Sequence, residues 1–495
     1  MQVIPGGFSC LRPQQELMAD RIREQIASRS QSSVHCAPTG TGKTLAYITG
    51  CLWSPARRAV ILTHTKALQD QILRDFRREV VDVRGASNFQ CGNHWGTCED
   101  GMAMGCASQL CRYKAQFSHA ASYRAIVTNY AMWAYNSQAL GMVDALVCDE
   151  AHLLDRVLTD CCSLLLTHRE AKDIGHRHGY CGPANSIGKA LTSAVMHPDT
   201  AAQSTDERLR RKRNQEVLSA MLADKSDIVI TENDKGVTVR TLWPVPWVRR
   251  LLAAGGRSLI LASATISREY AVNTLGLKDS EYYAYASPFD PAKAPIYLLP
   301  SGRMSHDASE DAVSRVFRAA CNICRQRESS KGIIHTVSYR RAREFVNFAR
   351  NLFPEQAVRM IEDAPGTEHK RRYLESENDI LVSASASTGY DFPDADCRWQ
   401  IVIKAPYADL GDPLVRCRSQ RKNSWLQVSM LDALVQMCGR NVRHAGDYGE
   451  TFVVDSAACE ALTHPQRVPE WVKARIRRLS AVSAIPKEEI ACRLV

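Results

Sequence analysis

Two short polar motifs, far apart in the sequence, carry residue types that bind and hydrolyse a nucleotide. Residues 37–44 read APTGTGKT, and such glycines let backbone N–H groups surround phosphate oxygens at the start of a helix. Lys43 would reach the β- and γ-phosphates, and the Thr44 hydroxyl would bind Mg²⁺. The second motif begins with Asp149 and Glu150, which supply one carboxylate to hold the metal and one to activate water. The loop residues predicted to contact the nucleotide are Thr39, Gly40, Thr41, Gly42, Lys43 and Thr44.

Apolar runs place both motifs at the ends of buried strands. The alternative, a glycine turn and an unrelated acidic surface pair, does not account for their order and for the strand before each motif. In the first half we expect strands at 34–37, 59–63, 126–128, 145–148 and 259–262. In the second half we expect them at 332–336, 380–383, 400–404 and 451–455. Strands that alternate with helical stretches are typical of parallel α/β sheets, so the sequence predicts an α/β protein with two tandem sheets.

Composition limits the class of protein. A chain of 495 residues is too long for a single core. Its net charge of +10 is compatible with a nucleic-acid partner without requiring one. We see no charged-then-apolar leader and no apolar run long enough to span a bilayer, so we expect a cytoplasmic protein. In that compartment the 18 cysteines would be reduced, and some could bind a metal.

Further motifs follow in a fixed order, and with them the chain resembles the superfamily 2 helicases, in particular the iron–sulfur group of XPD and DinG. The strings that carry the resemblance are RPQQ from Arg12, THTKAL from Thr63, TNY at 128–130, SAT at 263–265, TGYD from Thr388 and QMCGRNVR from Gln436. The resemblance implies two tandem RecA-like motor domains. It also implies that Arg12 and Gln15 contact adenine and that Gly389 and Asp391 bind nucleotide. His152 would relay the state of the γ-phosphate to the SAT residues.

The last of these strings carries two arginines, Arg440 and Arg443, three residues apart. On a helix that spacing places both side chains on one face. A planar, permanently charged guanidinium suits the charge that spreads over a phosphoryl group in its transition state. We therefore expect Arg440 and Arg443, with Gln436, to act on ATP that is bound by the first domain. A solvated basic helix face is the alternative reading.

Four cysteines lie between the THTKAL string and the acidic motif: Cys91, Cys98, Cys106 and Cys111. Four thiolates bind either a [4Fe–4S] cluster or tetrahedral zinc, and their spacing does not choose between the two. The resembled family carries its cluster in this interval, which implies iron–sulfur, with zinc and unligated core cysteines as alternatives. Cys321 and Cys324 lie in a helical pattern and are expected to pack in a core.

Nucleic-acid contacts are expected to be independent of sequence. Small hydroxyl donors suit the phosphate backbone, and the candidates are Thr63, Thr65, Ser338 and Thr388, each of which could equally be a helix cap or loop residue. The basic run from Arg208 to Arg213 lies in a region, 153–227, that we expect to be a mostly helical, arch-like insertion. Such a run is usually a solvated face.

Together these patterns predict an ATP-dependent DNA helicase that moves on single-stranded DNA, acts on forked DNA and is monomeric. A DNA-stimulated ATPase that remodels nucleoprotein without separating strands is the alternative. The resemblance implies 5′-to-3′ movement. The compact size of the chain suits a phage or plasmid, so we expect a bacterial or phage-infected cell, with replication, repair or defence proteins as candidate partners. We assign the first motor domain to 1–84, 117–152 and 228–272, the iron–sulfur module to 85–116, the insertion to 153–227, and the second motor domain to 273–495.

Overall fold

The chain folds into two compact units, each with its own parallel sheet. The computed structural model describes residues 3–106, 108, 111–175, 177–196, 205–255, 258–363, 368–384, 392, 394–439, 442 and 446–486. The first unit comprises 1–36, 42–284 and 409–423, and the second comprises 37–41, 285–408 and 424–495. The two units are described separately below.

The first unit contains a seven-stranded sheet in which every described pairing is parallel. In spatial order its strands are β11 (Glu281–Ala284), β1 (Ser32–Cys36), β10 (Ser258–Ser263), β5 (Ala145–Asp149), β2 (Ala59–Thr63), β4 (Ala125–Asn129) and β3 (Val80–Asp82). Its helices include α1 (Pro13–Ser28), α2 (Lys43–Trp53), α3 (Lys66–Asp75), α4 (Cys98–Ala103), α5 (Arg112–Ala120), α6 (Tyr130–Asn136), α7 (Leu154–Cys161), α10 (Val245–Gly255) and α11 (Arg268–Asn273). Because the strands are parallel, their carboxyl ends meet at one edge.

The second unit repeats this architecture. Its parallel strands run in the order β14 (Met360–Glu362), β15 (Ile380–Ser383), β13 (Gly332–His335), β16 (Trp399–Val402), β17 (Glu450–Asp455), β12 (Ile296–Gly302) and β18 (Ile476–Arg478). Its helices include α12 (Glu310–Arg325), α13 (Tyr339–Leu352), α14 (Pro354–Ala357), α15 (Glu368–Glu375), α17 (Trp425–Cys438), α18 (Ser456–Leu462) and α19 (Glu470–Lys473). Alternate residues of β12 face opposite layers: Tyr297 joins the core with α12 and α13, and Leu298 joins the core with α17 and α18. The predicted fold, two tandem α/β sheets, is confirmed.

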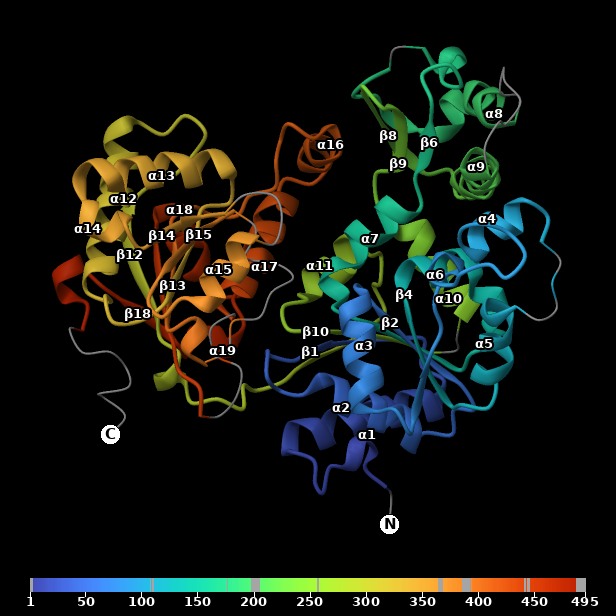
Figure 1. The fold of residues 1–495 in the computed structure, drawn as a ribbon, viewed down its shortest axis with the longest axis horizontal. Coiled ribbons are helices and arrows are strands. Elements are labelled where there is room, and N and C mark those ends of the chain that lie inside the picture. The colour runs from blue at the N-terminus through green and yellow to red at the C-terminus, as the bar shows by residue number, and fades with distance from the viewer. Residues whose placement is uncertain are drawn as a thin grey trace. The chain divides into compact units, whose positions relative to one another are not determined.

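The insertion after the acidic motif differs from the expectation of a mostly helical segment. It contains α8 (Gly188–Met196) and α9 (Thr205–Ala223), but also an antiparallel sheet in the order β6 (Leu164–Leu166), β9 (Gly236–Thr241), β8 (Asp227–Asn233) and β7 (Cys181–Pro183). Figure 1 shows this sheet beyond α7, set apart from the seven-stranded sheet of the same unit. Two of its strands have only three residues, too few to show an alternating pattern, and the β8–β9 hairpin lies beyond residue 227, where we ended the insertion.

One segment from the second half of the sequence packs within the first unit. Residues 409–423 include α16 (Pro413–Arg421), although we assigned them to the second motor domain. The buried Arg418 guanidinium donates to both carboxylate oxygens of Asp155 on α7, at 2.6 and 2.8 Å. The Arg240 guanidinium on β9 likewise donates to both carboxylate oxygens of Asp412. Paired charges with two-pronged geometry therefore hold this segment to the insertion.

Candidate active site

The glycine-rich loop has the backbone that phosphate binding requires. It connects β1 to α2, which begins at Lys43 as predicted. Gly40 and Gly42 have φ values of +78° and +77°, a region that side chains other than glycine rarely adopt. The Thr41 hydroxyl and N–H both donate to the Pro38 carbonyl, at 2.6 and 3.2 Å, and close the turn. The start of α2 thus presents its N–H groups and Lys43 at the end of β1.

The predicted adenine-contacting residues lie beside this loop. Pro13 begins α1, and the Arg12 N–H donates to the Gln15 side-chain oxygen at 2.8 Å. A Cβ atom placed on Gly42 would lie 2.1 Å from the Gln15 amide nitrogen, so a larger residue would displace the Gln15 side chain. Gln15 is buried and is held between the helix cap and the loop. Its contact with adenine stays a prediction.

The acidic motif lies at the carboxyl end of β5, with β10 between it and β1. Burial, reinforced by the nearby Glu150 charge and opposed by Lys43, raises the pKa of Asp149 from 3.8 to about 7. The buried Tyr130 hydroxyl donates to the Asp149 carbonyl at 2.7 Å. Glu150 has a φ of +50°, an uncommon conformation for a residue with a side chain, and this turn aims the chain out of the sheet. Two carboxyl groups therefore lie together at this strand end, and a cation bound there would favour their charged forms.

His152 connects this acidic end to the neighbouring strand. Its Nδ1 atom lies 3.3 Å from a Glu150 carboxylate oxygen and 2.9 Å from the Ser263 hydroxyl at the end of β10. The Thr265 N–H donates to the same hydroxyl at 3.3 Å. The predicted pairing of His152 with the SAT residues is therefore present in the structure, and any change in Glu150 can reach the end of β10 through one side chain.

Two residues near the site were not expected from sequence. Burial, together with the charges of Arg156 and His152, lowers the pKa of His64 below its usual 6.5, which places His64 near the acidic motif. Tyr47 is fully buried on α2, one turn after Lys43, and burial together with the Asp149 charge raises its pKa well above 10. The sequence gives no sign that Tyr47 lies at the site. Its ring fits the apolar pattern of the helix as a core residue, while its hydroxyl faces the site.

The nucleic-acid candidates fall into three classes. Thr63 is fully buried, and its hydroxyl donates to the carbonyls of Thr65 and Thr128, at 3.3 and 3.4 Å, so it shapes the loop from within. Thr65 is exposed and caps α3, and Ser338 caps α13 in the second unit. The Thr336 hydroxyl donates to the Ser338 carbonyl at 3.2 Å, the same local geometry as Thr63 and Thr65. Thr388 lies outside the described residues, as do Gly389, Asp391, Arg440 and Arg443.

The string with the predicted arginines begins on α17. This helix includes Gln436 and ends at Cys438, and Gly439 follows as its cap. The Gln400 side chain donates to the Met437 carbonyl at 2.9 Å, and the buried Arg475 donates to the Cys438 carbonyl at 3.2 Å. The end of the helix is therefore fixed just before Arg440. The prediction that the two arginines share a helix face is not tested by the described residues.

The four predicted metal-binding cysteines form two close pairs. The sulfur atoms of Cys91 and Cys106 are 4.0 Å apart, and those of Cys98 and Cys111 are 3.6 Å apart. A Cβ atom on Gly101 would lie 2.5 Å from the Cys91 sulfur, so glycine leaves room for this thiol. In the described part of the chain no three His, Cys, Asp or Glu side chains converge as a metal site. Cys321 and Cys324 are buried in the core of the second unit, as expected.

The basic run of the insertion is not a free charged face. Arg210 donates through both terminal nitrogens to the Glu170 carboxylate, at 2.6 and 2.9 Å, and Arg211 adds a bond of 3.2 Å. Arg213 donates to the Cys161 carbonyl at 2.6 Å. Three of the six residues in this run therefore form hydrogen bonds that hold α9 against β6 and α7. The Arg210 hydrogen bond and those from Thr167 outweigh burial and lower the pKa of Glu170 to about 2.

The raised pKa of Asp149 predicts a dependence of stability on pH. A carboxyl group that is more protonated in the folded than in the unfolded chain makes the folded state less stable as pH rises from 3.8 through about 7. Without nucleotide or Mg²⁺, Asp149→Asn should therefore unfold at a higher temperature than the wild type at pH 8, and the difference should shrink at pH 4. Thermal unfolding at both pH values measures this, and a less stable variant at pH 8 would contradict the assignment.

Comparison with known proteins agrees with this geometry. A sequence profile of the DEAD/DEAH box helicases matches residues 12–203, and a helicase C-terminal domain profile matches residues 321–475. The regulator of telomere elongation helicase 1 homolog of Caenorhabditis elegans is 31% identical over 114 residues, which are 20% of this chain and 11% of that protein. The chain thus spans about a tenth of the length of this curated relative.

Solved structures agree in fold. A structure named XPD_Helicase aligns with a TM-score of 0.62 at 15% identity and covers 95% of this chain and 100% of that one. Xpd4 of S. tokodaii aligns with a TM-score of 0.60 at 13% identity, with coverage of 95% and 100%. Membrane-spanning helices are not found among the described residues. The two profiles show that the chain contains a DEAD/DEAH box helicase domain and a helicase C-terminal domain, and the XPD structures agree with the observed fold of two parallel sheets.

Proposed function

We propose that this protein is an ATP-dependent DNA helicase that moves 5′ to 3′ on single-stranded DNA and separates forked duplexes. The contact of His152 with both Glu150 and Ser263 carries the proposal, because it links the place of hydrolysis to a second strand end. Lys43 influences Asp149 electrostatically, which supports one site made from both motifs. Direction of movement and preference for DNA over RNA rest on the family resemblance.

Each residue has a definite task in this scheme. The loop N–H groups and Lys43 hold the phosphates of ATP, and Thr44 with Asp149 would hold Mg²⁺, which neutralises charge on the phosphates. Glu150 orients and deprotonates water, and His152 senses the position of Glu150 through its 3.3 Å contact. Arg440 and Arg443 would stabilise the transferring phosphoryl group from the second motor domain. Gln15, tied to the loop at Gly42, would contact the base.

The strand would be bound through phosphates at two helix starts. Thr65 and Ser338 each cap a helix of ten or more residues, and each cap follows a strand of its own sheet. Thr63 and Thr336 shape these two loops from within. The two motor domains would thus use one local structure for the same task, and ATP-driven movement between them would advance the strand.

Strand separation on tailed duplexes tests this function. The wild type should separate a duplex with a 5′ single-stranded tail and leave one with a 3′ tail paired, only with ATP and Mg²⁺. Glu150→Gln should lower ATP turnover by about 10²- to 10⁴-fold while it still binds ATP, because it removes the base and not the phosphate loop. Lys43→Ala should lose ATP binding as well. ATP turnover stimulated by DNA without separation of any duplex would instead favour a translocase that remodels nucleoprotein.

The cysteine module would hold a [4Fe–4S] cluster, with zinc as the alternative occupant. Its four thiols fit either group by donor chemistry and form two close pairs. Cys91, Cys98 and Cys111 pack on one small core with Tyr113 and Phe89. Bound there, the group would tie the loop at Cys91, α4 and the start of α5 together. No step of ATP hydrolysis depends on it.

Metal content decides between the two occupants. Protein purified without oxygen should contain iron and acid-labile sulfide in equal amounts and show visible sulfur-to-iron absorbance. Cys98→Ser should lose both. A colourless protein with stoichiometric zinc would contradict the cluster assignment, and the tailed-duplex assay on the same sample separates the metal question from the activity question.

A further inference from the structure

The cysteine module is inserted at the edge of the first sheet, and a polar network joins it there to the loop at Thr65. Residues 83–88 lead from β3 into the module, and α5 leads out of it towards β4. The Arg84 N–H donates to the Gln116 side-chain oxygen on α5 at 2.9 Å. The Gln116 amide donates back to the Arg84 carbonyl, also at 2.9 Å. The Gln116 side chain thus forms the same two hydrogen bonds with the Arg84 backbone that a neighbouring strand would form, and it joins the segments that enter and leave the module.

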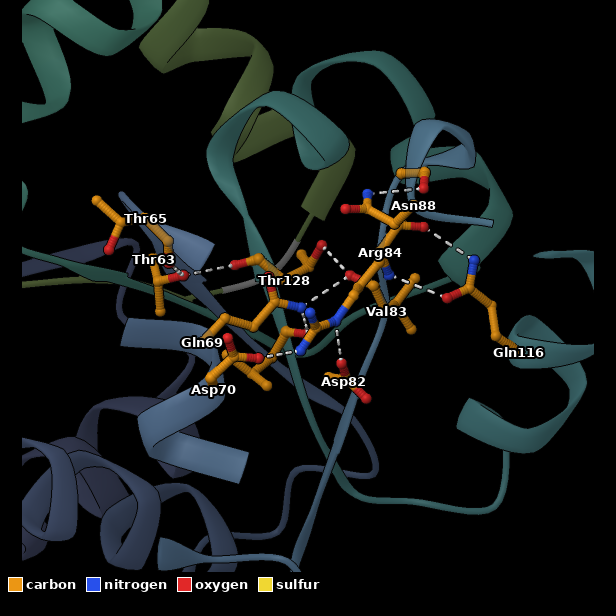
Figure 2. A network of polar contacts seen from close by, with 12 residues as sticks. Thr63, Thr65, Gln69, Asp70, Asp82, Val83, Arg84, Asn88, Gln116 and Thr128 are labelled. Atoms are coloured by element: carbon orange, nitrogen blue, oxygen red, sulfur yellow. Dashed lines mark hydrogen bonds and ion pairs between the residues drawn. The ribbon is translucent and has the colours of Figure 1, made fainter. Parts of the chain in front are cut away.

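Arg84 also extends to the helix that carries the predicted strand contact. Its guanidinium donates to Asp82 at 2.5 Å and to Asp70 on α3, and Figure 2 shows Arg84 between these two carboxylates. Thr65 caps the start of this helix, a little over one turn before Asp70. Arg84 is therefore the residue whose backbone is paired to the module and whose side chain is paired to α3.

The buried side of the same junction is equally connected. The Gln69 amide, fully buried on α3, donates to the Val83 carbonyl at 3.2 Å. The Thr128 hydroxyl donates to the same carbonyl at 2.7 Å, and the Thr63 hydroxyl donates to the Thr128 carbonyl at 3.4 Å. Figure 2 shows this continuous path from the Thr63–Thr65 loop to the segment that enters the module. Displacement of the loop or of α3 must therefore strain the base of the module.

The Arg84 ion pairs contribute little to stability. The side chains of Arg84, Asp70 and Asp82 are 26%, 56% and 23% exposed, and pairs so accessible to water are screened and weak. The buried bonds of Gln69 and Thr128 and the Gln116 pair remain when the guanidinium is removed. A role in positioning can thus be tested at Arg84 without unfolding the unit.

We propose that Arg84 is a positioning residue that couples the strand-contacting loop to the cysteine module. This inference rests on the proposed function and assigns Arg84 to the step in which movement along one strand becomes separation of two. DNA bound at Thr65 would shift α3, and Arg84 would transfer the shift to the module that meets the duplex. Without Arg84 the protein would still hydrolyse ATP on single-stranded DNA, but the cysteine module would no longer move with α3.

Three variants test the coupling. Arg84→Met keeps the aliphatic stem and the backbone pair with Gln116 but removes both ion pairs, and Asp70→Asn removes only the link to α3. Both should lower the rate of duplex separation about tenfold while DNA-stimulated ATP turnover changes by less than about twofold. Arg371→Met is the matched control, because Arg371 also pairs with two carboxylates, Glu368 and Glu375, on the exposed surface of α15. It should leave both rates unchanged.

Amide hydrogen exchange gives a readout that does not need strand separation. A single-stranded oligonucleotide should slow exchange in residues 63–68 and 84–103 of the wild type, but only in 63–68 of Arg84→Met. Equal protection of both segments in the variant, or parallel losses of ATP turnover and separation, would overturn the proposal. A wild type that shows coupled protection but separates no duplex would refute the helicase function and retain the coupling. A wild type with protection confined to 63–68 would refute the coupling alone.

Discussion

The burial of a carboxylate at the end of β5 is the constraint on which the rest of this structure depends. Asp149 is placed where water cannot solvate its charge, and its neighbour Glu150 adds a second negative charge. A protein maintains such an arrangement at a cost in stability, which cations bound at the site offset. Lys43 is one such cation, and the parallel sheet brings it there because β1 and β5 end at the same edge. The phosphate loop, the proposed metal ligands and the proposed catalytic base thus lie together because of one sheet geometry.

Polar side chains lead away from this edge in two directions. His152 contacts Glu150 and the Ser263 hydroxyl, which connects the proposed base to the end of β10. On the other side, His64 lies in the loop that ends in Thr65, and the charges of His152 and Glu150 act on it. From that loop the Thr63, Thr128 and Val83 bonds continue to Arg84 and the cysteine module. The proposed hydrolysis site, the proposed strand contact and the cysteine module are therefore connected within the first unit.

The sequence predicted the strands that are continuous apolar runs. A strand that is buried on both faces is apolar at every position, so it can be recognised without knowing which strands it pairs with. β2 and β15 match the predicted ranges, and β1, β4, β5, β10, β13, β16 and β17 differ by a few residues at their ends. β12 was missed although it lies between two strands, since Pro300 argues against a ladder position; a shift in register between Leu298 and Gly302 accommodates it. The insertion sheet was not predicted because its short strands have no recognisable sequence pattern and form only by pairing with neighbouring strands. At the candidate site, the motif residues could be predicted from their order, whereas the internal contacts of Thr63 and the junction at Arg84 depend on tertiary structure.

A double-mutant cycle on His152 and Ser263 tests most directly whether the hydrolysis site communicates through this contact. ATP turnover would be measured with and without single-stranded DNA for His152→Ala, Ser263→Ala and the double variant. If the 2.9 Å contact transmits the signal, each single variant loses most of the stimulation by DNA. The double variant then loses little more, with a coupling free energy of about 1 kcal/mol or above. Additive losses, or full stimulation in either single variant, would contradict the account.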